Sequence, residues 1–172
     1  MKRLLTLAAL AIFVVVSQNA TAQLKKFRIG LGIEGALPTG DMSNLYTVGG
    51  GLTARFEIRP LHNLAFNATA GAMIFSPKDI SGINTKPMLN IPVKLGVKYI
   101  FVGHLYGMLE LGNTTSHIYY YQSSNNSLQQ ATSNNFTIAP GIGVQLIGFD
   151  IGLRYESFGS NHFTGLRLGF GI

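Results

Sequence analysis

Apolar and polar residues alternate along most of this chain, and this period of two constrains the fold more than any other feature. The segment Leu52-Thr-Ala-Arg-Phe-Glu-Ile-Arg59 shows it without interruption. A period of two places successive side chains on opposite faces of a β-strand. Eight segments share the pattern: residues 27–37, 46–59, 64–75, 89–101, 104–114, 136–146, 149–158 and 163–172. The chain is therefore predicted to be all-β, with eight strands that each have two unlike faces.

The connections between these segments are of two kinds, which alternate along the chain. Short turns are expected at residues 60–63, 102–103 and 147–148. Longer or more polar connections are expected at residues 38–44, 76–87, 115–135 and 159–162. Successive hairpins give an antiparallel, up-and-down topology. All short turns then lie at one end of the sheet, an asymmetry that is typical of transmembrane β-barrels in bacterial outer membranes.

Every charged residue of the predicted strands lies on the face opposite to the apolar one. These residues are Arg28, Glu34, Arg55, Glu57, Arg59, Lys94, Lys98, Glu110, Asp150, Arg154, Glu156 and Arg167. The same face carries many glycines, which fit between large polar side chains inside a narrow eight-stranded barrel. We therefore predict a polar interior of paired ions, since an unpaired buried charge is costly. The apolar face would contact lipid.

The short turn at 102–103 also predicts the register of the strands on either side of it. It places Gly96 opposite Glu110, so that Lys94 and Lys98 flank Glu110 diagonally. With ions filling so narrow a barrel, the interior is expected to be a structural polar core with little room for a pore.

Composition bears on whether the barrel is in a membrane or in water. Charged residues make up only 12% of the chain, against about 25% in ordinary soluble domains. Cysteine is absent, so no disulfide framework is available. A soluble lipocalin-like binding barrel, with its apolar face inward, is one alternative. The net charge is +6, or +4 without Lys2 and Arg3, which is too small and dispersed to indicate nucleic-acid binding.

The first 22 residues have the features of a secretory signal peptide. Lys2 and Arg3 precede the apolar run Leu4–Val16, and Ala20-Thr-Ala22 is a small-x-small cleavage site. We expect export through this cleaved signal peptide, leaving residues 23–172 as one barrel domain in the cell outer membrane.

The whole of residues 23–172 resembles the small eight-stranded outer-membrane β-barrel proteins of Gram-negative bacteria, of the OmpX and OmpA transmembrane-domain type. Residues 91–101, with the sequence IPVKLGVKYIF, are typical of that group. The resemblance implies an integral barrel, expected to be monomeric, in contact with outer-membrane lipids. It also implies recognition by the barrel assembly machinery through the last strand, in which Phe170 is the nearest aromatic match and Ile172 follows.

No catalytic, cofactor-binding or metal site is predicted. Gly30-Leu-Gly-Ile-Glu-Gly35 has the spacing of a dinucleotide-binding loop, but it lies within a strand and no helix follows it. The four histidines are scattered over both ends and lack metal-ligand spacing. Ser160-Asn-His162 is loosely similar to the His-x-Ser-Asn signature of outer-membrane lipid A deacylases, with the order of residues changed. A lipid-modifying enzyme is thus an alternative to the preferred function, which is a non-enzymatic structural or surface-interaction role through the external loops.

Three consecutive tyrosines, Tyr119, Tyr120 and Tyr121, stand out in the expected connection 115–135. One interpretation is a surface-interaction loop with an unidentified partner. The other is that the fifth and sixth strands project past the membrane, with the tyrosines at the lipid boundary as an aromatic belt.

Overall fold

The computed structural model describes residues 27–78, 86–101, 103–122 and 127–172. The strands are β1 (Phe27–Thr39), β2 (Tyr46–Leu61), β3 (Leu64–Pro77), β4 (Met88–Ile100), β5 (Leu105–Gln122), β6 (Ser127–Gln145), β7 (Phe149–Phe158) and β8 (Asn161–Gly171). A single helical turn, α2 (Met42–Leu45), lies between β1 and β2. The predicted signal peptide, residues 1–22, lies outside the described residues.

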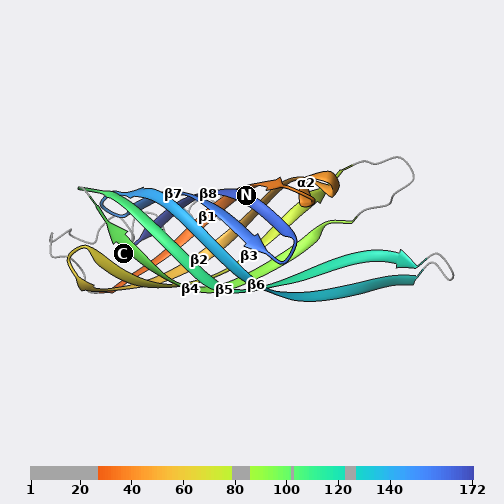
Figure 1. Cartoon of the computed structure of the whole chain (residues 1–172), viewed down its shortest axis with the longest axis horizontal. Coiled ribbons are helices and arrows are strands. Elements are labelled where there is room, and N and C mark those ends of the chain that lie inside the picture. Colours follow the sequence, from red (N-terminus) through yellow and green to blue (C-terminus); the bar gives the residue numbers. More distant parts are fainter. Residues whose placement is uncertain (1–26, 79–85, 102, 123–126) are drawn as a thin grey trace, which may run out of the picture.

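The strands form one closed barrel in which each strand pairs with its neighbours in the sequence. Every pairing is antiparallel, and β1 pairs with β8 from Gly30 opposite Gly171 to Thr39 opposite His162. Figure 1 shows the strands tilted steeply against the long axis of the barrel. The predicted all-β, eight-stranded, up-and-down barrel is therefore confirmed.

Glycines with positive φ make two of the tight turns at one end of the barrel. Gly103 has a φ of 59° between β4 and β5, and Gly148 has a φ of 78° between β6 and β7. Most residues with a side chain avoid this region, so glycine allows the chain to reverse within a few residues. The turn between β2 and β3 lies at the same end, which we call the short-turn end.

The alternation of the sequence is reproduced in the burial of the side chains. Leu31, Leu52 and Leu95 on the outside are 70%, 66% and 68% exposed, whereas Lys98 and Glu110 on the inside are fully buried. Soluble monomers rarely have an outer surface covered with large apolar side chains, because their exposed apolar patches are small. It is the pattern of a transmembrane barrel. The described residues include no helix long and apolar enough to cross a membrane.

The connections at the other end of the barrel differ from the sequence-based expectation. Residues 115–135 were expected as a polar connection. Residues 115–122 and 127–135 instead continue β5 and β6 as a hairpin, in agreement with the interpretation in which the fifth and sixth strands project. Residues 159–162 were expected as a longer connection, but β7 and β8 are joined by the two residues Gly159 and Ser160. These corrections have one physical reason: strand pairing continues past the apolar band wherever two polar segments can still form a ladder.

Apolar side chains close the interior at the end opposite the short turns. The closing cluster, which we call the apolar plug, consists of Ala36, Met42, Tyr46, Met73, Phe75, Met88, Phe158 and Phe163. Met42 belongs to α2, so the helical turn contributes a buried side chain to the plug. Figure 1 shows α2 at the end of the barrel from which the hairpin of β5 and β6 extends. The sequence analysis did not predict this plug.

Candidate functional site

A network of charged and polar side chains fills the barrel between the apolar plug and the short-turn end. Glu110 of β5 is fully buried near its centre. Its Oε1 accepts hydrogen bonds from Asn67 Nδ2 at 2.5 Å and Thr69 Oγ1 at 2.7 Å, both on β3. Arg55 Nη2 and Lys94 Nζ each lie 3.5 Å from the same carboxylate. Side chains from β2, β3, β4 and β5 therefore meet at one carboxylate.

The register predicted around Glu110 is confirmed, because Gly96 lies directly opposite it. A Cβ added at Gly96 would lie 2.6 Å from the carbonyl oxygen of Leu109 and 2.7 Å from Glu110 Cγ. The absence of a side chain at Gly96 therefore creates the space that the Glu110 side chain occupies. Of the two flanking lysines, Lys94 contacts Glu110, whereas Lys98 reaches other carboxylates.

A second group of ions lies around Arg154 of β7. Its Nη1 donates to Glu34 Oε1 at 2.6 Å, and its Nε lies 2.9 Å from Glu156 Oε2. Glu156 also accepts a hydrogen bond from Lys94, which joins this group to Glu110. Glu34 further accepts from Thr53 Oγ1 at 2.9 Å. Strands on opposite sides of the barrel are thus linked through its interior.

A third group surrounds Asp150, toward the short-turn end. Arg167 Nη1 donates to Asp150 Oδ1 at 2.9 Å, and the Tyr106 hydroxyl donates to the same oxygen at 3.1 Å. Lys98 Nζ lies 3.4 Å from Asp150 Oδ2, and Arg55 Nη1 lies 3.5 Å from Oδ1. Arg55 therefore connects the Asp150 group to the Glu110 group.

Glu57 pairs with two basic side chains at this end. Lys98 Nζ donates to its Oε2 at 2.7 Å, and Arg59 Nη2 donates to its Oε1 at 2.6 Å. Arg59 also donates to Gln145 Oε1 at 2.5 Å. Each carboxylate of the interior is therefore held by at least two basic side chains.

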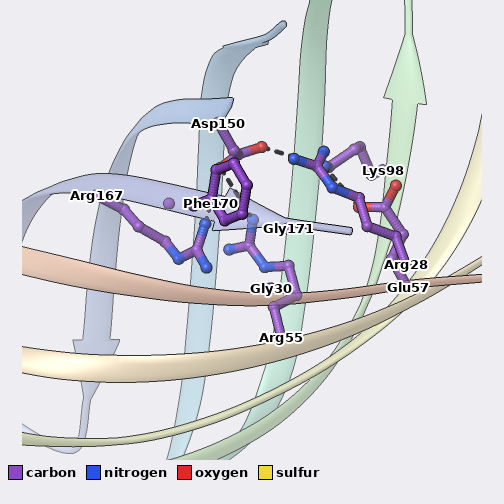
Figure 2. A pocket seen from close by; sticks show the side chains of 10 residues that line it. Arg28, Gly30, Arg55, Glu57, Lys98, Asp150, Arg167, Phe170 and Gly171 are labelled. Carbon is purple, nitrogen blue, oxygen red and sulfur yellow. Dashed lines mark hydrogen bonds and ion pairs between the residues drawn. The ribbon is translucent and has the colours of Figure 1, made fainter. Parts of the chain in front are cut away.

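All of the charged residues predicted for the barrel interior are on the inner face. Eleven of them form ion pairs with one another: Glu34, Arg55, Glu57, Arg59, Lys94, Lys98, Glu110, Asp150, Arg154, Glu156 and Arg167. Arg28 has no ion pair within 4 Å in the part of the chain that the structure describes, and it lines a small cavity at the short-turn end (Figure 2). The cavity leaves about 10 Å³ for the centre of a water-sized sphere.

The uncharged members of the network were not predicted from the sequence. Asn67, Thr69, Thr53, Tyr106 and Gln145 complete the hydrogen bonding of the carboxylates. They have the same strand parity as the charged residues, so the alternation could have identified them as interior groups. Which carboxylate each one contacts depends on closure of the barrel.

The serine that contacts His162 is not the one in the motif considered for the lipid-modifying alternative. His162 Nδ1 lies 2.9 Å from Ser157 Oγ, rather than pairing with Ser160, and its ring stacks on Tyr155 with centroids 5.9 Å apart. Among the residues described, no carboxylate forms an ion pair with His162. No cluster of metal-ligating residues is found in the described part of the chain.

The hairpin of β5 and β6 extends well beyond the rest of the barrel (Figure 1). Pairing between these strands continues to Gln122 opposite Ser127. However, β4 pairs with β5 only as far as Ile118, and β7 pairs with β6 only from Thr137. Beyond Ile118 and its partner Ala131 the hairpin is two-stranded, whereas residues 131–136 form an edge next to β5, which still pairs with β4 there. We call residues 119–122 and 127–136 the projecting ribbon. Tyr119, Tyr120 and Tyr121 lie in its β5 strand.

Comparison with known proteins identifies the fold but no family. No protein-family model and no curated protein matches the sequence. Among solved structures, the attachment invasion locus protein Ail of Yersinia pestis matches with a TM-score of 0.62 and 12% identity, covering 85% of this chain and 97% of that one. The N-terminal β-barrel domain of OprF from Pseudomonas aeruginosa gives 0.59 and 12%, covering 84% and 97%.

Further neighbours have the same architecture. The outer-membrane protein OprG of Pseudomonas aeruginosa matches with a TM-score of 0.52 and 12% identity, covering 85% of this chain and 95% of that one. De novo designed transmembrane β-barrels also match, at 0.51 and 11%. Identities this low establish a shared fold, the small eight-stranded transmembrane barrel, and one fold can serve many functions.

Proposed function

We propose that the chain is a non-enzymatic integral protein of the outer membrane whose projecting ribbon is a surface-interaction element. The ribbon would take up an extended segment of a partner protein as an additional strand. Residues 1–22 would direct export and be removed, and the barrel domain would be inserted by the barrel assembly machinery. The interior network would serve as a rigid polar core that holds the ribbon outside the membrane.

The outer surface supports a position in lipid. Besides its large apolar side chains, it carries aromatic pairs toward the short-turn end: Phe27 with Phe56, Tyr99 with Phe101, and Phe149 with Phe170. Aromatic girdles of this kind are found where transmembrane barrels meet the membrane–water interface. The short-turn end would then face the periplasm, and the projecting ribbon the cell exterior.

The free edge of β6 is the observation that carries the interaction role. Residues 127–136 pair with β5 on one side and with no strand on the other, in the part of the chain that is described. Natural edge strands are usually protected by charged residues, prolines or bulges. Residues 115–136 contain no charged residue and no proline. An unprotected edge can pair with an extended segment, which supplies main-chain hydrogen bonds.

The comparison adds support of a general kind. One neighbour, Ail, is by its name an attachment protein. This chain shares its fold, and attachment requires an element that reaches beyond the membrane surface, as the projecting ribbon does.

A labelled peptide with the sequence of residues 115–122 tests the free edge, because that sequence already pairs with β6 inside the protein. The full chain in detergent is expected to bind it saturably in a fluorescence anisotropy titration. The double variant Thr132→Lys and Asn134→Lys should bind at least about tenfold more weakly, since lysines protect edge strands. As a matched control, His62→Lys and Asn63→Lys add the same charge at the short-turn end and should leave binding unchanged. Equal binding by all three proteins would refute the edge-pairing role.

The lipid-modifying alternative rests on the contact between Ser157 and His162. Mass spectrometry of lipid A from cells with and without the protein separates the two functions. We expect an unchanged acyl pattern. A change that disappears in Ser157→Ala would replace the proposed function with an enzymatic one.

A further inference from the structure

The cavity at the short-turn end has an unbalanced lining. Its charged residues are four cations, Arg28, Arg55, Lys98 and Arg167, and two anions, Glu57 and Asp150. Figure 2 shows these side chains converging from β1, β2, β4, β7 and β8. The lining therefore has two more cations than anions, and one of these cations, Arg55, also pairs with Glu110 outside the lining.

The two carboxylates of the cavity are already occupied by other cations. Glu57 is held by Lys98 at 2.7 Å and by Arg59 at 2.6 Å. Asp150 is held by Arg167 at 2.9 Å. Within the described residues, Arg28 is the cation of the lining without an ion pair closer than 4 Å. Positive charge that the protein does not neutralise favours an anion from solution.

Glycines provide the space on one side of the cavity. Gly30, Gly169 and Gly171 line it. A Cβ added at Gly171 would lie 2.7 Å from Arg28 Nε, and one added at Gly169 would meet the Arg167 guanidinium. The two guanidinium groups thus lie against glycines of the last strand. Arg167 already donates to Asp150 and Thr53, whereas the N–H donors of Arg28 remain for a ligand.

We propose that this cavity binds a small inorganic anion of the class of chloride. About 10 Å³ of the cavity is open to the centre of a water-sized sphere, which is room for one small particle, so a monatomic halide suits the cavity better than a polyatomic anion. Guanidinium groups offer several N–H donors in fixed directions, which suits coordination of a single anion. Arg28 is half-buried, so an anion can enter from the short-turn end. The bound anion would balance the charge of the Asp150 group.

Anomalous diffraction from crystals of the full chain grown or soaked in bromide tests the site directly. We expect one bromide peak among Arg28, Arg55 and Arg167. Absence of a peak there, in crystals that show ordered side chains at these residues, would overturn the proposal. This measurement uses the wild-type protein, so it does not depend on the folding of any variant.

Thermal unfolding in detergent gives an independent measurement. Chloride replaces gluconate, an anion too large for the cavity, at constant ionic strength. The unfolding temperature should then rise with chloride concentration until it levels off, because a ligand bound only to the folded state stabilises that state. Arg28→Gln should raise the apparent dissociation constant for chloride at least tenfold, and Lys78→Gln, at the far end of the barrel, should leave it unchanged. If Arg28→Gln does not fold, Arg28→Lys provides the comparison. An equal response of wild type and the Arg28 variant, or an equal response to gluconate, would contradict the proposal, since it would indicate general screening.

Discussion

Glu110 shows how one interior carboxylate holds several strands together. Asn67, Thr69, Arg55 and Lys94 all contact it. Glu110→Ala would leave two buried cations without this partner, and breaking a buried ion pair typically costs about 3–5 kcal/mol. We expect a loss of that order in the free energy of unfolding, measured by denaturant titration in detergent. Lys78→Ala, which removes an exposed hydrogen bond to the carbonyl oxygen of Ser43, should cost less than about 1 kcal/mol. Similar losses for both variants would argue against the network as a structural core.

On the inner face, glycine is required at some positions because neighbouring atoms leave no space for a side chain, and not because of the backbone conformation. Gly96→Ala places a Cβ against Leu109 and Glu110 and should destabilise the barrel by about 1–3 kcal/mol, as overpacking does. Gly35→Ala is the matched control, because nothing lies within 4 Å of an added Cβ there. The same unfolding titration distinguishes them, and a stable Gly96→Ala would mean that Glu110 can move aside without cost.

Among the strands, the two-stranded part of the projecting ribbon, residues 119–122 and 127–130, is separate from the closed part of the barrel. The pairings that close the barrel end at Ile118 on β5 and begin at Thr137 on β6. Deleting residues 119–130 and joining the strands with an Asn-Gly turn should therefore leave the unfolding temperature within a few degrees of wild type. Thermal unfolding monitored by gel mobility checks this, and a barrel that no longer assembles would show that the ribbon contributes to closure.

The ends of the strands were harder to predict than their middles. Within the apolar band, one face must be apolar and the other polar, so the period of two is clear, and β7 was predicted with the bounds that it has. Beyond the band both faces of β5 and β6 are polar, so alternation disappears although pairing continues. The apolar plug was not predicted for a related reason. Phe75 and Phe163 come from distant strands, and only closure brings their ring centroids to 5.4 Å.

At the scale of the whole molecule, the apolar outer surface gives the sharpest test of a membrane position. Leu95 is 68% exposed on that surface. In a bilayer, Leu95→Arg should cost about 2–4 kcal/mol if the residue lies near the midplane, whereas on a water-soluble barrel it would cost almost nothing. Unfolding titrations in lipid vesicles measure this difference. Wild-type protein that is soluble without detergent and shows no heat-dependent gel mobility would contradict the membrane barrel.

The filled interior gives a second prediction at this scale. Ion pairs occupy the barrel and the apolar plug closes one end. Eight strands enclose an interior only wide enough for side chains. Planar bilayers containing the full chain are therefore expected to show no stable open channel. Steady conductance steps in the wild-type protein would contradict the closed interior.

Which residues face inward and which face outward follows from the amino-acid sequence alone, because a period of two is a property of each strand. From that followed eight strands, their order, the polar interior and the register that places Gly96 opposite Glu110. Which ions meet depends on closure of the barrel, since Arg154 and Glu34 are 120 positions apart and come together only in the closed barrel. Closure also decides where the plug and the charge-unbalanced cavity lie. Contacts across a barrel depend on strand tilt and closure, which no single strand encodes.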